Sequence, residues 1–383
     1  MIAITVEIAR RDRRHDILIG DFLPDRWPEA IEKQAPSDKH FAVVDRRVAQ
    51  AHGIEAVLAG RTGWATVPFD AGEEHKGWRE YADLCESLIR LGIDRKSVVV
   101  AIGGGVTGDV AGFAAATILR GVRFAQVPTT LVAQVDSSVG GKTGIDIAGG
   151  KNLLGAFHQP ETVLVEPGFL STLPEREFRA GLAEAIKYGI IADADFFERL
   201  AASPESLLRR DPAPLAEIVA HCCRMKADIV GRDERDVGRR ALLNHGHTFG
   251  HALEALAGYD GSLLHGEAVG MGMILAAEFA AASGLADSGQ AERTAAVLRR
   301  FGIPGRLSDL PPPAGAGADW REGISVARLC SALEKDKKSA SAGLTLILPR
   351  RIGDCRAEGG FSPEEVAEFI LSRLALRQVP IFA

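Results

Sequence analysis

Short apolar runs alternate with amphipathic segments through the first half of the chain. Five of these runs have the length of a strand: 41–44, 64–69, 97–102, 124–127 and 163–165. The run at 97–102 is apolar at almost every position, which is typical of a strand buried on both faces of a parallel sheet. Residues 77–92 carry apolar side chains at helical spacing and stop at Gly92. A second helix, rich in small residues, is predicted over 110–119.

The pattern changes near Leu173 and Pro174, where strand-like runs nearly vanish and long helical patterns continue to about residue 300. The Pro- and Gly-rich stretch 304–319 predicts a loop, 344–348 one late strand and 363–376 a terminal helix. A chain of 383 residues is also long for a single core. We therefore predict two domains. Residues 1–172 form a Rossmann-like α/β domain with a mostly parallel sheet, and residues 173–383 form a mainly α-helical domain.

Composition limits which cellular compartment and which binding partners are expected. A net charge of −6 disfavours general binding to nucleic acid or to acidic membranes. The five cysteines are odd in number and lack ligand spacing, which suits free thiols in a reducing cytoplasm. Residues 1–8 alternate like a strand rather than a signal peptide, and the apolar stretch 268–286 carries Glu278, which favours a buried helix over a membrane span. We expect a cytoplasmic protein.

A glycine-rich turn follows the most apolar strand. Residues 103–109 read Gly-Gly-Gly-Val-Thr-Gly-Asp and lead into the predicted small-residue helix. Glycines let the backbone approach a phosphate, and the first turn of a helix offers free amides and the positive end of its dipole. Such turns also need glycine for steric reasons, and the spacing differs from Gly-x-Gly-x-x-Gly. The turn predicts a dinucleotide site without the ordinary fingerprint.

The segment 128–160 is dense in Ser, Thr, Gly, Asp, Lys and Asn. Lys142 and Lys151 each follow a pair of glycines, where a flexible backbone can bend the cation onto an anion. Either lysine alone would be interpreted as a surface residue of a loop. Together with Asp136 and Asn152, they favour the floor of an anion-binding pocket.

Four of the ten histidines fall within one stretch: His245, His247, His251 and His265. His247 and His251 are four residues apart, so on a helix both project from one face. Any one of them alone is more typical of a capping or buried imidazole. Imidazole is, however, the commonest neutral nitrogen ligand of zinc and the usual proton shuttle near neutral pH. The cluster predicts a metal site with a neighbouring acid–base group.

Several long motifs, in this order, resemble the 3-dehydroquinate synthase family. They are Gly-Gly-Gly-Val-x-Gly-Asp at 103–109, Val-Asp-Ser-Ser-Val-Gly-Gly-Lys-Thr at 135–143, Gly-Lys-Asn-x-x-Gly-Ala-Phe-His-Gln-Pro at 150–160, Ala-Gly-x-Ala-Glu-x-x-Lys-Tyr-Gly at 180–189 and Leu-Asn-x-Gly-His-Thr-x-Gly-His-Ala at 243–252. The resemblance extends from Asp45 to the Asp-Lys-Lys at 336–338. A set of ungapped motifs in order is far more specific than any single one.

The resemblance implies a reaction of the shikimate pathway. In it, 3-deoxy-D-arabino-heptulosonate 7-phosphate is converted to 3-dehydroquinate and phosphate. NAD transiently oxidises the C5 hydroxyl, phosphate is eliminated, the ketone is reduced again and an intramolecular aldol reaction closes the ring. A divalent metal assists as a Lewis acid, with zinc expected first and cobalt possible.

The resemblance also implies roles for individual residues. Glu184, His247 and His265 would be the metal ligands, which leaves an open position for substrate oxygens. His251 would be the acid–base or phosphate-contacting group. The residues implied around the substrate are Asp136, Lys142, Asn152, Lys187, Lys226, Arg240, Asn244 and Lys337, with Arg120 reaching over from the partner subunit of a homodimer. The residues implied around NAD are Asp45, Gly72, Glu73, Lys76, Gly104, Gly105, Val106, Thr107, Gly108, Asp109, Thr129, Thr130, Lys142, Lys151, Phe169, Leu170, Ser171 and Thr172.

Three alternatives remain open at this point. Another sugar phosphate cyclase, of the valiolone or deoxy-inosose type, would share the scaffold, NAD and metal. A metal-dependent alcohol dehydrogenase of the glycerol dehydrogenase kind would release reduced cofactor and has little need for so many cations. A degenerate relative would bind a nucleotide or a partner without turnover. The intact lysine motifs, with Arg240 and Lys337, favour a substrate that carries both a phosphate and a carboxylate.

Overall fold

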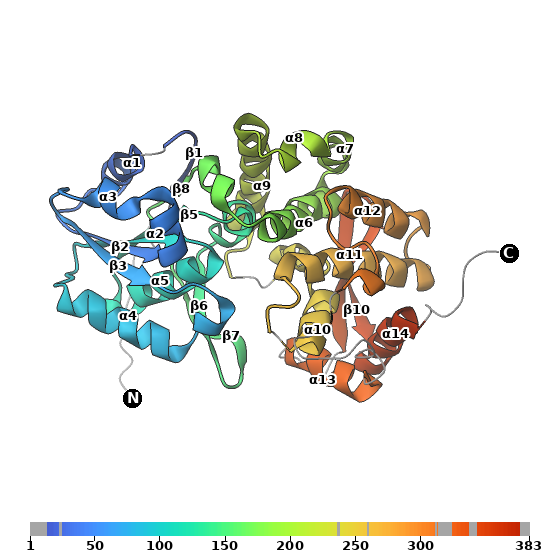
Figure 1. Cartoon of the computed structure of the whole chain (residues 1–383). Coiled ribbons are helices and arrows are strands. Elements are labelled where there is room, and N and C mark those ends of the chain that lie inside the picture. Colours follow the sequence, from blue (N-terminus) through green and yellow to red (C-terminus); the bar gives the residue numbers. More distant parts are fainter. Residues whose placement is uncertain are drawn as a thin grey trace, which may run out of the picture.

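The structure is a computed structural model that describes residues 14–22, 25–235, 238–258, 260–310, 312, 324–336 and 343–375. The strand predicted at 1–8, half of the loop predicted at 304–319, the last residue of the predicted terminal helix and Lys337 lie outside these ranges. In the described part, the sheet and its helices form one half of the molecule and a helical bundle forms the other (Figure 1).

The first half is built on a six-stranded sheet in the order β1-β8-β5-β4-β2-β3. All neighbouring strands are parallel. The strands are β1 (Asp16–Ile19), β2 (His40–Asp45), β3 (Trp64–Phe69), β4 (Val98–Gly103), β5 (Arg123–Pro128) and β8 (Thr162–Val165). The predicted Rossmann-like sheet is confirmed, and β1 is a strand that the sequence did not reveal.

Helices cover both faces of this sheet. They are α1 (Trp27–Gln34), α2 (Arg46–His52), α3 (Ile54–Leu58), α4 (Trp78–Arg90) and α5 (Gly105–Thr117). Because side chains alternate along a strand, Val99 and Ala101 of β4 lie in the core beneath α4 and α5, whereas Val98 and Val100 lie in the core beneath α1 and α3. The helix predicted over 110–119 begins earlier, since Gly105 and Gly108 belong to its first turn.

An antiparallel hairpin, β6 (Lys142–Ile147) and β7 (Gly150–Phe157), projects from the sheet half (Figure 1). It follows a π-helical turn, η3 (Ala133–Ser137). The apolar and polar positions of this segment do not alternate regularly, so no strands were predicted here. Gly144 and Gly155 face each other so closely that a Cβ on either would overlap the opposite strand. Glycine is therefore required at the crossing.

The second half is mainly helical, as predicted. Its helices are α6 (Glu175–Ala192), α7 (Ala194–Ala202), α8 (Pro204–Leu208), α9 (Pro212–Arg232), α10 (His247–Ala257), α11 (His265–Ala282), α12 (Gly289–Arg300), α13 (Val326–Asp336) and α14 (Pro363–Ala375). A two-stranded antiparallel sheet accompanies them, formed by β9 (Leu344–Arg351) and β10 (Asp354–Phe361). The late strand predicted at 344–348 is confirmed within β9, and β10 is an addition.

The two halves share a core. Val163 and Val165 of β8 lie in the same buried cluster as Ile186 of α6 and Met273 of α11. The sheet half and the helical half therefore pack against each other through apolar side chains. The exact bounds 1–172 and 173–383 stay a prediction.

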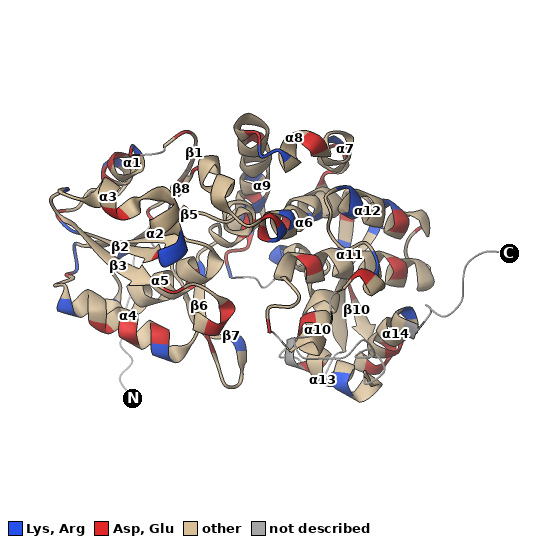
Figure 2. Cartoon of the chain, in the orientation of Figure 1, with Lys and Arg blue, Asp and Glu red and all other residues tan. Residues whose placement is uncertain are grey.

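The outer surface carries both signs of charge. Acidic and basic residues are interspersed along outer helices such as α4 and α14 (Figure 2). Among the described residues, no helix is long and apolar enough to cross a membrane. The apolar stretch that begins at Ala268 lies in α11, which is buried along most of its length, as predicted.

Candidate active site

Two histidines and a glutamate that are distant in sequence meet in the helical half. Glu184 lies in the middle of α6, while His247 and His265 are the first residues of α10 and α11. One ligand atom from each lies within 4.8 Å of the other two. Glu184 Oε1 is 3.8 Å from His247 Nε2 and 3.5 Å from His265 Nε2. The structure thus brings together the three predicted metal ligands.

Close helix packing places the two imidazoles. Gly246 precedes α10 in a left-handed conformation (φ 80°), and a Cβ there would lie 2.8 Å from the carbonyl oxygen of Val269 in α11. A Cβ at Gly272 would overlap the carbonyl oxygen of Gly246. Because both positions are glycine and carry no side chain, the backbones of α10 and α11 can come into direct contact. The glycines around the histidine motif therefore support the cluster.

The charges of the cluster suit a cation. Burial, reinforced by the nearby Lys187 ammonium, lowers the pKa of His247 to about 3, so its imidazole is neutral as a metal ligand must be. Burial also acts to lower the pKa of His265, but hydrogen bonds to Glu184 and Glu254 outweigh it and raise that pKa to about 10. The carboxylates thus draw positive charge to this point. Two imidazoles and one carboxylate are a donor set that fits zinc.

Glu254 is a functional candidate that the sequence reasoning missed. Its Oε1 lies 3.5 Å from Nδ1 of His265, on the side of the ring away from Glu184. His251, Glu254 and His265 also form a second group that could hold an ion. A carboxylate behind a metal-bound histidine commonly fixes its ring orientation. The available signal was the spacing of positions 247, 251 and 254 on one face of α10.

A buried row of alternating charges leads away from the cluster. Lys187 Nζ lies 2.5 Å from Glu184 Oε2 and 3.8 Å from Asp136 Oδ1. Lys226 Nζ lies 3.0 Å from the same Asp136 oxygen, to which the Tyr188 hydroxyl donates at 2.7 Å. Burial acts to lower the pKa of Lys187, but the two carboxylates outweigh it and raise that pKa. Lys187 is 1% exposed and stays charged.

A cavity of about 540 Å³ lies at the far end of this row. Its walls come from η3, the β6–β7 hairpin, α9 and η5 (Arg239–Asn244). The predicted site residues that line it are Asp109, Asp136, Lys142, Asn152, Lys226 and Arg240. Arg240 is held in the wall because it donates to the carbonyl oxygens of Glu234 at 2.6 Å and Gly140 at 3.2 Å. The polar segment predicted to form an anion pocket does form a cavity with cations in its walls.

Other predicted substrate residues lie apart from this cavity. Asn244 is exposed at the end of η5, between Arg240 and the histidine motif. Arg120 is exposed and has a left-handed backbone (φ 69°), next to Leu119 in the same conformation. His251 stacks with His265, with the ring centroids 6.0 Å apart, so it lies in the metal-ligand cluster rather than among the cavity lysines.

The residues predicted to bind NAD gather at the carboxyl edge of the parallel sheet. Asp45 ends β2 and caps α2, accepting from the Arg47 amide at 2.9 Å. Gly104 caps α5, whose first turn carries Thr107, and Thr129 follows β5. The hydroxyls of Thr107 and Thr129 are buried without a hydrogen-bond partner in the described structure. Unsatisfied buried groups of this kind fit a polar ligand that lies against them.

Two further predicted NAD segments close on the same edge. Lys76 pairs with Asp109 of α5 at 2.7 Å, and Glu73 pairs with Lys151 of the hairpin at 2.8 Å. Gly72 precedes them with a φ of 152°. The remaining residues form η4 (Pro167–Thr172), where Phe169 and Leu170 are buried and Ser171 is exposed. Thr172 contacts His52, at the end of α2, with 2.7 Å between Oγ1 and Nε2.

Comparison with known proteins identifies the family to which the sequence is similar. Residues 66–180 match the family model for the N-terminal part of 3-dehydroquinate synthase, and residues 181–339 match the model for its C-terminal part. The 3-dehydroquinate synthase of Halorhodospira halophila is 44% identical over 94% of this chain and 97% of its own length. That of Pelobacter propionicus is 46% identical over 93% and 95%.

Solved structures agree. The 2-epi-5-epi-valiolone synthase of Streptomyces hygroscopicus, with NAD⁺ and Zn²⁺ bound, superposes with a TM-score of 0.83 at 26% identity, covering 97% of this chain and all of its own. A 2-deoxy-scyllo-inosose synthase complexed with carbaglucose-6-phosphate, NAD⁺ and Co²⁺ gives 0.81 at 26% identity, over 94% and 98%. A probable glycerol dehydrogenase of Sinorhizobium meliloti, at 17% identity and a TM-score of 0.65 over 95% and 98%, shares the fold alone. The family models and the 44–46% identities together establish that this chain belongs to the 3-dehydroquinate synthase family.

Proposed function

We propose that this chain converts 3-deoxy-D-arabino-heptulosonate 7-phosphate to 3-dehydroquinate and phosphate. The observation that carries the proposal is the row of buried charges between the metal-ligand cluster and the cavity. It joins Glu184, through Lys187 and Asp136, to Lys226. One end suits a divalent cation and the other suits an anion. A substrate with hydroxyls at one end and a phosphate at the other can span both.

Glu184, His247 and His265 are the residues that would hold a divalent ion, zinc or cobalt, and the turn at the start of α5 would hold NAD. When bound, NAD accepts and returns a hydride while the ion polarises substrate hydroxyls. The two synthases of known structure contain NAD⁺ with Zn²⁺ or Co²⁺, which supports this assignment. Glu254 would hold the His265 ring in the orientation that points Nε2 at the site.

The remaining side chains would bind and orient the substrate. Lys142, Lys226 and Arg240 would make charge-assisted hydrogen bonds to phosphate and carboxylate oxygens in the cavity. Asn152, whose left-handed backbone (φ 53°) presents it from β7, would add a neutral donor. His251, beside the metal ligands, would exchange a proton with the substrate. Lys187 would keep Glu184 and Asp136 ionised between the two ends.

We also propose that the working unit is a cytoplasmic homodimer in which Arg120 completes the site of the partner subunit. Its exposure, on a short turn with two successive left-handed residues, suits a side chain that reaches outward. The five cysteines are all free, as a reducing compartment would keep them.

An assay for phosphate release tests the proposed reaction. The purified protein with Zn²⁺ and NAD is expected to release one phosphate per heptulosonate phosphate consumed, while the absorbance of NADH stays flat because the hydride returns. A chelator should stop the release, and added Zn²⁺ or Co²⁺ should restore it. Accumulation of NADH in step with substrate loss would instead indicate a dehydrogenase. Cyclase activity confined to substrates without a carboxylate would indicate a valiolone- or inosose-type enzyme.

Cofactor choice gives a second test. Asp45 lies at the end of β2 with a side chain only 8% exposed, where it can accept from a ribose hydroxyl but would repel a 2′-phosphate. In a fluorescence titration, NAD is expected to bind at least roughly tenfold more tightly than NADP, since one lost charge-assisted hydrogen bond costs about 1.5–3 kcal/mol. Asp45→Asn should reduce the difference between the affinities for NAD and NADP. Tighter binding of NADP to the unaltered protein would contradict the assignment.

A further inference from the structure

An ion pair outside the active site connects the two helices that carry Glu184 and His265. Arg176, in the first turn of α6, donates from Nε to Glu267 Oε1 at 2.7 Å and from Nη2 to Glu267 Oε2 at 2.6 Å. Glu267 lies in the first turn of α11 with a side chain only 9% exposed. Two parallel hydrogen bonds to one carboxylate fix distance and orientation together.

The same two side chains also hold the segment that leads into α11. Glu267 Oε2 accepts from the amide of Leu264 at 3.0 Å, and Arg176 Nη2 donates to the carbonyl oxygen of Ser262 at 2.5 Å. His265 stands between Leu264 and Glu267 in sequence. As the first residue of α11, with a side chain 41% exposed, it depends on this entry turn for its position.

The backbones of α6 and α11 touch next to the pair. A Cβ at Gly266 would overlap the carbonyl oxygen of Ala180, so the two helices have no freedom to move closer there. Glu184 follows Ala180 by one turn of α6. The spacing between Glu184 and His265 is therefore set by a backbone contact that the Arg176–Glu267 pair holds shut.

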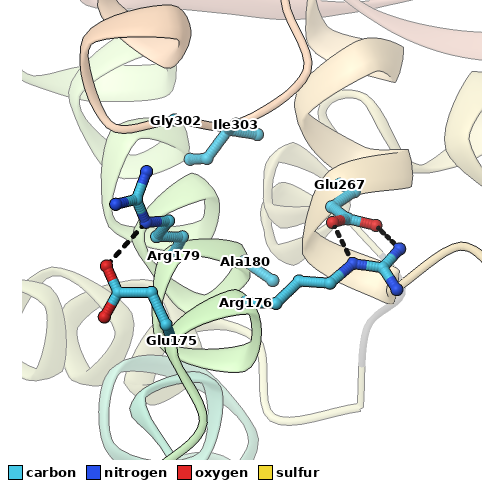
Figure 3. A pocket seen from close by; sticks show the side chains of 7 residues that line it. All are labelled: Glu175, Arg176, Arg179, Ala180, Glu267, Gly302 and Ile303. Carbon is cyan, nitrogen blue, oxygen red and sulfur yellow. Dashed lines mark hydrogen bonds and ion pairs between the residues drawn. The ribbon is translucent and has the colours of Figure 1, made fainter. Parts of the chain in front are cut away.

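A cavity of about 280 Å³ lies beside the pair. Its lining includes Arg176, Arg179 and Glu267, and Figure 3 shows the two arginines diverging. Arg176 crosses to Glu267 on α11, whereas Arg179 turns back to Glu175 on its own helix, at 2.7 Å. The neighbouring arginines thus differ in whether they connect the helices.

We propose that Arg176 and Glu267 are positioning residues, which hold the entry of α11 against α6 and so keep His265 at metal-binding distance from Glu184. The inference rests on the proposed metal site. It adds a pair of residues that would touch neither metal, NAD nor substrate, yet set the affinity for the ion. Removing the pair should let the entry turn of α11 loosen while both helices remain folded.

The test is Zn²⁺ affinity, measured by competition between the metal-free protein and a chromophoric chelator. Arg176→Leu is expected to weaken Zn²⁺ binding roughly tenfold, at the lower end of the range for residues that support metal ligands, because it acts through the entry turn. Arg179→Leu is the matched control and should bind Zn²⁺ like the unaltered protein. The visible spectrum of bound Co²⁺ should change for Arg176→Leu alone, since it reports ligand geometry rather than overall stability.

Two additional variants separate positioning from misfolding. Arg176→Leu leaves the Glu267 carboxylate without its partner. The double variant Arg176→Leu/Glu267→Gln removes both charges, and it should weaken Zn²⁺ binding no more than whichever of Arg176→Leu and Glu267→Gln alone weakens it more. Arg176→Lys keeps one of the two hydrogen bonds to Glu267, so its Zn²⁺ affinity should lie between those of the unaltered protein and Arg176→Leu. Unaltered Zn²⁺ affinity and Co²⁺ spectrum in Arg176→Leu, with His265→Ala losing the ion, would overturn the inference and leave the metal site standing. Retention of the ion by His265→Ala would overturn both.

Discussion

Replacing Lys187 by methionine is expected to lower turnover at least about thirtyfold, because one buried charge-assisted partner is typically worth roughly 2–5 kcal/mol. Lys187 is buried between Glu184 and Asp136, so water cannot take over its charge. Asp136 would then hold Lys226 alone and draw it away from the substrate. The measurement is kcat for phosphate release, with Lys33→Met, an exposed lysine of α1, as the control.

The same variant should keep its cofactors. Glu184 faces Lys187 with Oε2 and the histidines with Oε1, so the metal-facing oxygen remains. NAD affinity and metal content are therefore expected to be close to normal. In the metal-free protein, the stranded carboxylates should lower the free energy of unfolding by about 3–5 kcal/mol. Normal turnover in Lys187→Met, or loss of the metal together with activity, would contradict the proposed role.

Replacing His265 by alanine is expected to abolish both metal content and turnover. Only two of the three proposed ligands would remain, one carboxylate and one imidazole. NAD binding should persist, because the glycine turn lies on the other half of the chain. Elemental analysis of the dialysed protein gives the metal content, and titration gives the affinity for NAD.

A histidine outside the site supplies the control for this variant. His75→Ala, on the short turn η1 (Glu73–His75), removes a partly exposed imidazole close to Glu80 rather than to the cluster. It should bind the metal normally. A His265→Ala protein that retains both metal and activity would refute the ligand assignment, and loss of the metal in His75→Ala would point to general damage.

The parts of the fold that were predictable depend on local pattern. β2 and β4 contain continuous apolar runs because both faces of the central sheet are covered, and burial of this kind is visible in sequence. β6 and β7 were not predictable, since glycines that permit their close crossing interrupt the alternation. The edge strand β1 has only four residues, one of them exposed, and within the described residues it pairs only with β8. Too little local signal remains for such a strand.

For the site, motif resemblance located most of the residues but not their connections. His247 and His251 are recognisable from helical spacing alone. The link from Glu184 through Lys187 to Asp136 depends on α6 packing against η3, which no local pattern encodes. The Arg176–Glu267 pair was missed for the same reason, whereas Glu254 shares a face of α10 with His247 and His251 and its contact with His265 is what the local spacing does not show. An isolated acid or arginine on a helix is usually a surface residue, and only tertiary contact distinguishes these.

If the proposed metal and anion sites are occupied, the alternating charge along the row from Lys226 to Glu184 would couple their affinities. A cation bound at Glu184 would weaken the ion pair between Glu184 and Lys187. The Lys187 ammonium would then interact more strongly with Asp136. Asp136 in turn relaxes its hold on Lys226, which becomes freer to meet an anion. Such linkage is reciprocal. The factor by which the bound cation raises the affinity for the anion is also the factor by which the bound anion raises the affinity for the cation. A cell poor in divalent metal but rich in substrate would therefore keep more of this protein loaded than the metal concentration alone suggests.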